Sequence, residues 1–221
     1  MSVVSRSETL TLTGPAGALA ALIETPARDT QEVAHFGVIC HPHPLHGGTM
    51  DNKVVYTLAR AFQERGVPTI RFNFRGVGGS AGRYDEGRGE TQDALAVIRH
   101  GRQRWPGAGL WLGGFSFGGA VAIRAASTAD ATRLVSVAPA VAYAADPGIG
   151  LPRCPWLIVQ GTEDDVVDPR AVAGFIAGVS PAPQLTMLQG AGHFFHGRLL
   201  ELRDAVLQFL AQEQPLAPHV P

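Results

Sequence analysis

Ser116 is the residue whose surroundings most clearly predict chemistry. It lies in the sequence Gly-Phe-Ser-Phe-Gly, after an apolar run over 110–115 and before a stretch of small residues over 118–127. A serine on a sharp turn between a strand and a helix is typical of a nucleophile elbow, because the flanking glycines permit the strained turn. The amide of Phe117, at the start of the helix, would then face an oxyanion that forms at the serine. The motif arises by chance in a chain with 27 glycines, so its position between strand and helix carries the prediction.

Candidates for a base and a supporting acid follow later in the chain. A turn with three acids, Gly-Thr-Glu-Asp-Asp over 161–165, follows an apolar run, and Gly-Ala-Gly-His over 190–193 follows another. A positioned imidazole removes the hydroxyl proton, and a carboxylate fixes the tautomer of the imidazole and stabilises its cation. The order serine, acid, histidine, each after a later strand, is the one expected when a nucleophile elbow lies in a fold of alternating strands and helices.

The elements that must position these residues alternate between strand and helix. Polar–apolar alternation on both sides of Gly14-Pro15 predicts an antiparallel hairpin of strands 9–13 and 18–25. Further strands are expected at 36–40, 69–74, 110–115, 134–138, 155–160 and 184–188. Helices are expected at 52–65, 90–105, 118–127, 169–179 and 198–212. Continuous apolar strands separated by helices predict an α/β fold with a mostly parallel sheet of about eight strands and helices on both faces.

A histidine-rich loop, His-Pro-His-Pro-Leu-His-Gly-Gly over 41–48, follows the predicted strand 36–40. In this fold, backbone at this place normally supplies the second donor to the oxyanion. The two prolines have no amide hydrogen, so His43, Leu45 or amides further along remain as donors. Three histidines within six residues also suit zinc, although completing four ligands needs Asp51 or a remote residue. Packing of the loop is the simpler interpretation.

Two glycine-rich segments look superficially like nucleotide-binding loops. Gly-Val-Gly-Gly-Ser-Ala over 76–81 fits the dinucleotide pattern, but a charged loop follows instead of a helix. No strand-end acid follows at about twenty residues, where a ribose partner belongs. The segment 47–53 lacks the Lys-Ser/Thr ending of a phosphate-binding loop. We therefore expect no cofactor; Arg75, just before the first of these loops, is expected to anchor it through hydrogen bonds.

Composition narrows the class of protein. The 221 residues carry a net charge of −1, which gives no basic field for nucleic acid or an anionic membrane. No stretch approaches the ~20 apolar residues of a transmembrane helix, and the start lacks the apolar run of a secretory signal. Cys40 and Cys154 lie beside apolar runs, as reduced, buried thiols do. We expect a cytoplasmic protein with a small-molecule substrate and no nucleic-acid or membrane partner.

Four segments together resemble the α/β-hydrolase superfamily, and in particular a bacterial group of small hydrolases often described as dienelactone-hydrolase-like. The segments are HPHPLHGGTMDNKVV, FNFRGVGGS, GFSFGG and VQGTEDDVVDP. The resemblance implies that Asp164 is the acid, with Asp165 as the nearby alternative, and that His193 rather than His196 is the base. Asp168 precedes a proline, so it is expected to cap a helix.

The same resemblance bears on the oxyanion hole and on the substrate. It implies that the amide of His43 is the second donor beside Phe117, with Leu45 as the next candidate. Dienelactone hydrolases themselves use a cysteine nucleophile, whereas Ser116 favours ordinary ester chemistry.

The sequence thus predicts a single α/β-hydrolase domain over 1–221, with 214–221 as a loosely held tail. About sixteen residues separate the strands 134–138 and 155–160, too few for a cap domain. The predicted reaction is hydrolysis of small acyl esters or thioesters through an acyl intermediate on Ser116. The alternatives are a non-catalytic α/β-hydrolase scaffold that binds a small ligand and a zinc-dependent hydrolase. Candidates to line a small apolar pocket, or to pack the core, are Phe115, Phe117, Tyr143, Phe194 and Phe195.

Overall fold

The structure is a computed structural model and describes residues 6–27, 32–144 and 150–212, so the expected tail 214–221 lies outside the described residues. It contains one sheet of eight strands in the order β1-β2-β4-β3-β5-β6-β7-β8. The strands are β1 (Arg6–Gly14), β2 (Gly17–Thr25), β3 (His35–Cys40), β4 (Thr69–Phe72), β5 (Gly109–Phe115), β6 (Ala131–Val137), β7 (Trp156–Gly161) and β8 (Gln184–Leu188). The helices are α1 (Lys53–Glu64), α2 (Arg88–Arg104), α3 (Phe117–Thr128), α4 (Pro169–Ala177) and α5 (Leu199–Ala211).

The sheet is mostly parallel, as the sequence predicts. β1 pairs antiparallel with β2, and β2 pairs antiparallel with β4, whereas all other neighbours are parallel. The predicted ranges agree with the observed elements to within a few residues. β4 ends at Phe72, earlier than expected, because the chain turns away there into the glycine-rich loop.

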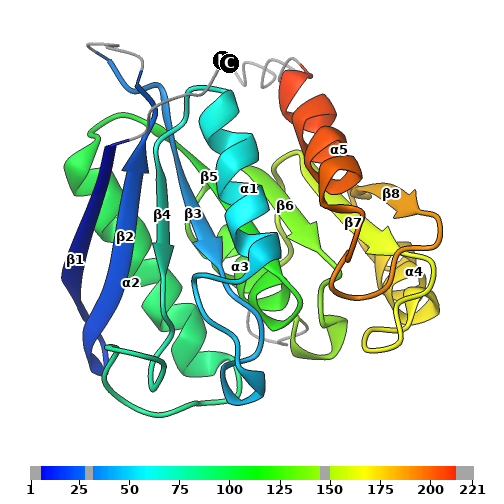
Figure 1. Cartoon of the computed structure of the whole chain (residues 1–221), viewed down its shortest axis with the longest axis horizontal. Helices are drawn as coiled ribbons and strands as arrows, with labels where there is room; N and C mark the ends of the chain where they lie inside the picture. The colour runs from blue at the N-terminus through cyan, green and yellow to red at the C-terminus, as the bar shows by residue number, and fades with distance from the viewer. Residues whose placement is uncertain (1–5, 28–31, 145–149, 213–221) are drawn as a thin grey trace.

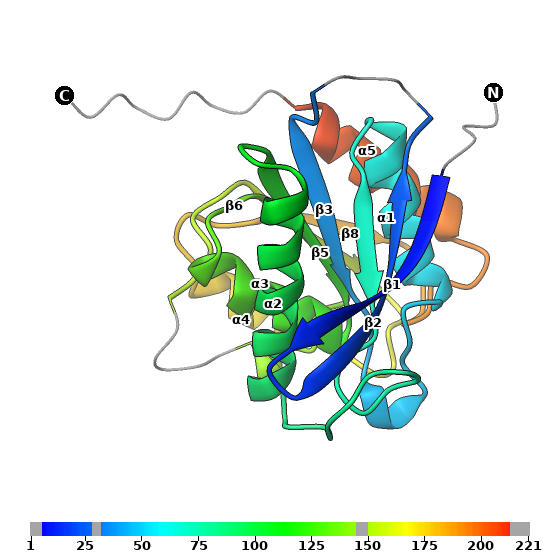
Figure 2. The same ribbon diagram turned by 90° about the vertical axis from the view of Figure 1, so that its left-hand side faces the viewer.

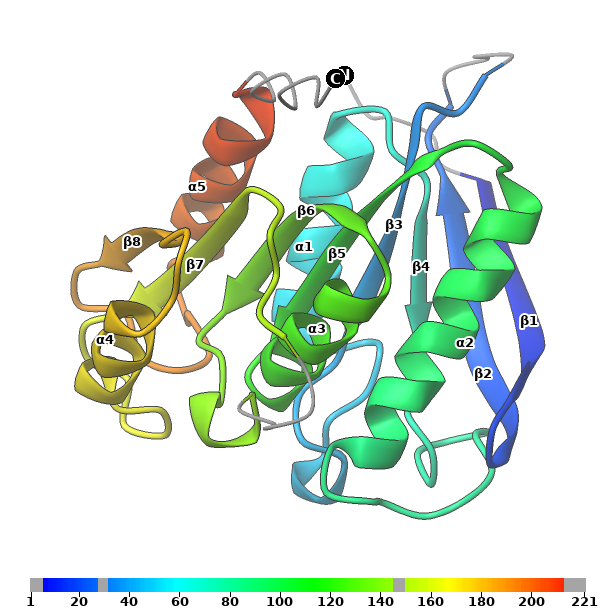
Figure 3. The ribbon, with the colours of Figure 1, turned by 180° about the vertical axis from the view of Figure 1, so that it is seen from behind.

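Helices cover both faces of the sheet. α1 and α5 lie on the face toward the viewer in Figure 1, and α2, α3 and α4 lie on the opposite face, seen in Figure 3. Figure 2 views the sheet along its β1 edge, with the two helical layers on either side. Alternate residues of β5 feed the two cores: Leu112 packs with α2 and α3, while Trp111 and Phe115 pack with α1 and α5. Because both faces are covered, β5 is apolar along its length instead of alternating.

The carboxyl ends of the parallel strands meet at the lower edge of the sheet in Figure 1. β3 and β5 are neighbours in this sheet, and Cys40 pairs with Gly114 in their register. The histidine loop after β3 and the serine turn after β5 therefore leave the sheet side by side. β7 and β8 are also neighbours, with Gly161 opposite Leu188, so the acidic turn and the histidine turn leave the sheet together.

The connection between β6 and β7 is short, running from residue 138 to residue 155. Its described part holds one turn of 3₁₀ helix, η2 (Val141–Tyr143). A segment of this length has no room for a cap domain, which confirms the predicted lidless fold. Over the part of the chain that the structure describes, no helix combines the length and apolarity that crossing a membrane would take.

Candidate active site

Ser116 occupies a strained turn between β5 and α3. Its φ of 55° and ψ of −119° fall in a region that residues with a side chain rarely adopt. The turn is held from the next strand: the Ser116 amide donates to the carbonyl of Val137 at 2.9 Å, and its own carbonyl accepts from the amides of Ala120 and Ala140. The predicted sharp turn between a strand and a helix is therefore present, and the surrounding backbone fixes the direction of the serine side chain.

The glycines of the elbow are required by close backbone approaches. A Cβ on Gly114 would lie 2.1 Å from the carbonyl oxygen of Gly118. A Cβ on Gly118 would lie 2.3 Å from the carbonyl oxygen of His41 and 2.4 Å from that of Cys40. The start of α3 thus packs directly against the end of β3, and this contact joins the elbow to the histidine loop.

Three side chains that are far apart in the sequence form a chain of hydrogen bonds. Ser116 Oγ lies 3.0 Å from His193 Nε2, and His193 Nδ1 lies 2.8 Å from Asp164 Oδ2. Since a carboxylate only accepts, Nδ1 carries the proton and Nε2 accepts from the serine hydroxyl. His193 is 3% exposed, and the side chain of Asp164 is fully buried. This arrangement suits removal of a hydroxyl proton by an imidazole that a carboxylate orients.

Asp164 is the best-supported carboxylate of its turn. Its Oδ1 accepts from the amides of Val166 at 2.9 Å and Val167 at 2.8 Å, while its Oδ2 accepts from His193 and from Gln160 Nε2 at 2.8 Å. Burial by itself acts to raise the pKa of Asp164, but the hydrogen bonds from His193 and the two amides outweigh it and lower the pKa below its usual value. The group is therefore ionised at neutral pH.

The other candidates for the acid and the base lie outside the hydrogen-bond chain. Asp165 and His196 are exposed and take no part in this hydrogen-bond chain. Asp168 caps α4, as expected, because its side chain accepts from the amide of Arg170 at 2.8 Å.

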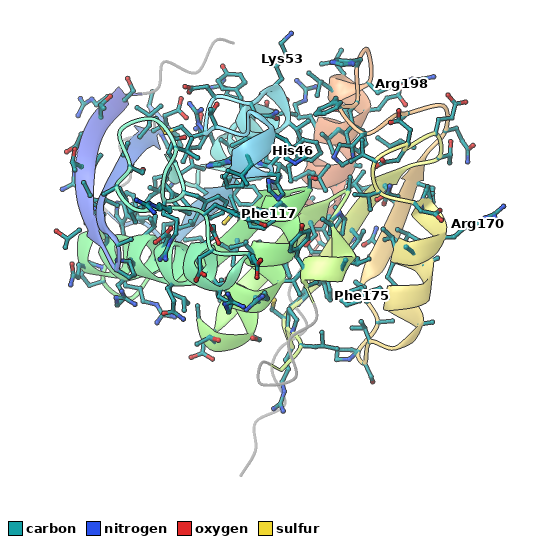
Figure 4. The ribbon with its side chains drawn as sticks, turned by 90° about the horizontal axis from the view of Figure 1, so that it is seen from below. His46, Lys53, Phe117, Arg170, Phe175 and Arg198 are labelled. Atoms are coloured by element: carbon teal, nitrogen blue, oxygen red, sulfur yellow. The ribbon has the colours of Figure 1, made fainter. Side chains whose placement is uncertain are left out.

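The histidine loop lies against the elbow. It contains a short 3₁₀ turn, η1 (Pro44–His46), and the Nδ1 of His43 accepts the amide of Leu45 at 3.2 Å. The His43 ring packs on the Phe117 ring with 5.0 Å between centroids. Figure 4, which views the molecule from below, shows His46 and Phe117 close together near the middle of this face. The two segments predicted to supply oxyanion donors are thus in contact.

His41 fastens this loop to the sheet. Its Nδ1 lies 2.7 Å from the carbonyl of Pro42, and its Nε2 accepts the amide of Phe74 at 3.0 Å. The carbonyl can only accept and the amide can only donate, so the ring is neutral with its proton on Nδ1. Burial lowers the pKa of His41 to about 4. Both ring nitrogens are occupied, which removes one histidine from the zinc alternative, and the described residues contain no group of three or more His, Cys, Asp or Glu suited to a metal ion.

The glycine-rich loop after β4 is held by hydrogen bonds to α2 and to the segment that follows the histidine loop. Arg75 forms three hydrogen bonds with the buried carboxylate of Asp93, through its own amide, Nε and Nη2, which confirms the expected anchoring role. Asn73 Oδ1 accepts the amide of Met50 at 2.9 Å, which ties this loop to the end of the histidine loop. No phosphate-binding helix follows it; α2 begins only at Arg88.

Only part of the expected aromatic pocket is open to solvent. Phe115, Phe117 and Phe195 are buried in the cores, whereas Phe194 is 48% exposed and its ring lies 5.1 Å from that of His193. Tyr143 is partly buried and packs on Phe117.

Known proteins resemble this chain in sequence and fold. A sequence model of the family described as serine aminopeptidase, S33, matches residues 43–154. A lidless α/β serine hydrolase from Xanthomonas campestris superposes with a TM-score of 0.88 and 39% identity, over 96% of this chain and 97% of that one. An α/β serine hydrolase homologue from Coxiella burnetii gives a TM-score of 0.87 and 45% identity, over 96% and 100%. The chain belongs to this family of α/β serine hydrolases. An uncharacterized protein of Rickettsia prowazekii (strain Madrid E) is 33% identical over 195 residues, 83% of this chain and 82% of that protein.

Two buried polar residues of this α/β serine hydrolase were missed by the sequence interpretation. His41 was grouped with the other histidines of its loop, although its place directly after β3 is where a buried side chain is expected. Gln160 lies within an otherwise apolar strand, and that isolated polar side chain was a signal that could have been followed.

Proposed function

We propose that this α/β serine hydrolase cleaves small acyl esters or thioesters through an acyl intermediate on Ser116. The observation that carries the proposal is the hydrogen-bond chain from the strained Ser116 through His193 to Asp164. Ser116 Oγ attacks the substrate carbonyl carbon while His193 Nε2 takes the hydroxyl proton. The tetrahedral intermediate collapses, and the same proton passes to the leaving alcohol or thiol. Water, deprotonated by His193, then releases the acid and restores the serine.

The oxyanion hole is proposed to use the amides of Phe117 and His43. Phe117 is the first residue of α3, where a helix has amides without intrahelical acceptors and a positive dipole end. The amide of Leu45, the other candidate, already donates to the His43 ring within the 3₁₀ turn. That leaves His43 as the better-supported second donor, on a loop that touches the elbow.

The exposed apolar side chains near the site favour a substrate with an apolar portion. Leu45, Val166 and Phe194 are 69%, 60% and 48% exposed, and each lies within two residues of a proposed site residue. They extend from loops after three different strands of the sheet. We propose that they cover the acyl chain or leaving group at the mouth of the site, in place of a lid.

A fluorophosphonate probe read by mass spectrometry tests the nucleophile. We expect a stoichiometric adduct on Ser116, absent in Ser116→Ala and much slower to form in His193→Ala. No adduct on folded wild-type protein would refute the proposal and favour the non-catalytic scaffold.

A series of p-nitrophenyl esters from acetyl to octanoyl tests the apolar mouth. We expect Phe194→Ser to lower kcat/KM for the octanoyl ester several-fold, since part of an aromatic contact area is lost, and to leave the acetyl ester almost unchanged. Leu185→Ser, on the far edge of the sheet in β8 and 38% exposed, is the matched control. Equal effects on both esters would contradict this assignment.

We also propose that the chain folds as one domain, because its two cores lie on the two faces of one sheet. A single cooperative transition in urea, followed by both fluorescence and circular dichroism, is the expected result.

A further inference from the structure

Gln160 is a buried polar side chain directly behind the proposed triad. It lies near the end of β7 and is fully buried. Its Nε2 lies 2.8 Å from Asp164 Oδ2 and 3.2 Å from the carbonyl oxygen of Val167. Both neighbours can only accept hydrogen bonds, so the orientation of the amide is determined: the NH₂ group faces Asp164.

The carbonyl oxygen of the Gln160 side chain lies in an unfavourable environment. Its Oε1 is buried and has no hydrogen-bond partner among the described residues. A buried carbonyl without a partner destabilises the fold, whereas the other β7 side chains that enter the cores are apolar and carry no such penalty. What favours a glutamine here is therefore the hydrogen bond that its NH₂ group donates to Asp164. That hydrogen bond goes to Oδ2, the same oxygen that accepts from His193.

We propose that Gln160 is a positioning residue, which orients the Asp164 carboxylate and shares its charge so that Asp164 holds His193 in the catalytic geometry. This inference rests on the proposed function. Two backbone amides hold Oδ1, and Gln160 and His193 share Oδ2. Without Gln160, Oδ2 keeps one donor, so more of its charge acts on His193 and the imidazolium becomes easier to form.

The surroundings of His193 limit what else changes with pH. Its ring contacts are Phe115 and Phe194, and its polar contacts are Ser116 and Asp164. The charged groups on the adjoining loops are Glu163, Asp165, Asp168 and Arg198, and the other titratable side chains nearby are His196 on its own loop and His43 and His46 on the histidine loop. None of these changes when residue 160 is replaced, so a shift of the acid limb of kcat/KM reports on Asp164 and His193.

The experiment compares Gln160→Leu, Gln160→Glu and a matched control, Gln63→Leu, in p-nitrophenyl acetate hydrolysis from pH 5 to 9. Gln63 is also a buried glutamine whose Nε2 donates a 2.8 Å hydrogen bond, to Thr69 Oγ1 at the start of β4, away from the site. We expect Gln160→Leu to lower kcat by about 10-fold with little change in KM, the loss typical of a hydrogen bond to a charged group. Its acid limb should move to higher pH, so its activity relative to wild type is lowest in acid.

Gln160→Glu is expected to show the opposite pH trend. A protonated glutamic acid donates to Asp164 in place of the amide, and two carboxylates this close do not both ionise readily. Its activity relative to wild type should therefore be highest at low pH and fall as the pH rises. Low-field proton NMR adds a direct signature: the His193 Nδ1 proton resonance, absent in His193→Ala, should shift in both Gln160 variants and stay in place in Gln63→Leu.

The proposal would be overturned if folded Gln160→Leu had the same kcat, the same acid limb and the same Nδ1 proton resonance as the wild type. So would losses in Gln160→Leu that match those of Gln63→Leu and only follow the folded fraction. Ser116→Ala separates this failure from that of the proposed function: if Ser116→Ala still turns over substrate, the function itself is wrong, whereas an inactive Ser116→Ala with unaffected Gln160 variants refutes the positioning role alone.

Discussion

Replacement of Gly118 by alanine tests whether the elbow and the histidine loop are one rigid unit. Gly118 is the second residue of α3, where helix propensity alone favours alanine over glycine. The added Cβ would lie 2.3 Å from the carbonyl oxygen of His41 and 2.4 Å from that of Cys40. Both are backbone atoms at the end of β3, and neither rotates away as a side chain would. The substitution must push the start of α3 away from the strand.

The two effects on stability have opposite signs. Exchange of glycine for alanine in a helix gains up to about 1 kcal/mol, whereas overpacking in a close-packed interior costs about 1–3 kcal/mol. Contacts well under 3 Å to two backbone atoms place Gly118→Ala at the upper end of that range, so we expect a net loss of about 2 kcal/mol. Gly174→Ala in α4 is the matched control, because nothing lies within 4 Å of its added Cβ, and it should be neutral or stabilising by up to about 1 kcal/mol.

Activity should fall further than stability. α3 begins directly after Ser116, so a displaced helix start moves both the hydroxyl and the Phe117 amide relative to the loop that carries His43. Misplacement by about 1 Å lowers turnover by about 100-fold in well-organised sites. Urea unfolding at equilibrium and p-nitrophenyl acetate turnover measure the two effects. If Gly118→Ala unfolds at the same urea concentration as Gly174→Ala and keeps wild-type turnover, the rigid contact between α3 and β3 is disproved.

Three further predictions concern titration. The pKa of Asp164 in the folded protein is lowered from 3.8, so ionised Asp164 stabilises the fold fully above pH 3.8. This contribution is lost as the pH falls through the pKa of the folded state. The urea midpoints of wild type and Asp164→Asn should therefore converge in acid. Burial gives His41 a pKa of about 4 in the folded protein, against 6.5 when unfolded, so the free energy of unfolding should fall by about 3 kcal/mol as the pH is lowered from 6.5 to 4. Urea titrations at each pH measure this fall, which His41→Phe should not show. Cys40 is buried as expected, whereas Cys154 is only partly buried. Burial raises the pKa of the Cys40 thiol and that of Cys154 to about 11, so an aromatic disulfide reagent at pH 8 should react slowly with folded protein and rapidly with two thiols in urea; rapid reaction at Cys40 before unfolding would contradict its buried placement.

Local patterns were enough to predict the elements, Ser116 and the two turns that carry the proposed acid and base. The apolar run before Ser116 and the small residues after it define a strand and a helix within a short window, and the order of Asp164 and His193 follows from the parallel topology. The choice between Asp164 and Asp165 rested on a family resemblance, since both lie on one turn. In the structure, the amides of Val166 and Val167 converge on Asp164, a feature of turn geometry that residue types do not show.

Contacts between segments distant in sequence were beyond prediction. Both Leu45 and His43 have an amide hydrogen, so on that ground either could be the second oxyanion donor. Only the structure of the 3₁₀ turn shows that the Leu45 amide donates to the His43 ring. The hydrogen bond from the Phe74 amide to His41 spans 33 residues, and the one between Met50 and Asn73 spans 23. No periodicity or motif encodes such pairs, because each depends on where two loops leave a common sheet.

These distant contacts also explain how a site without a lid can be organised. Closure of a lid positions groups at the moment of binding, whereas here the positions must exist beforehand. His41 fixes the histidine loop to the end of β4, Gly118 allows α3 to touch that loop, and the amides of Val166 and Val167 hold Asp164 from behind. Each of these contacts involves a backbone atom of the protein itself, so it needs no substrate to form. Free and acyl-bound protein should therefore show the same backbone at these loops, and a loop movement of more than about 2 Å on acylation, the scale of a true rearrangement, would show that organisation comes from binding instead.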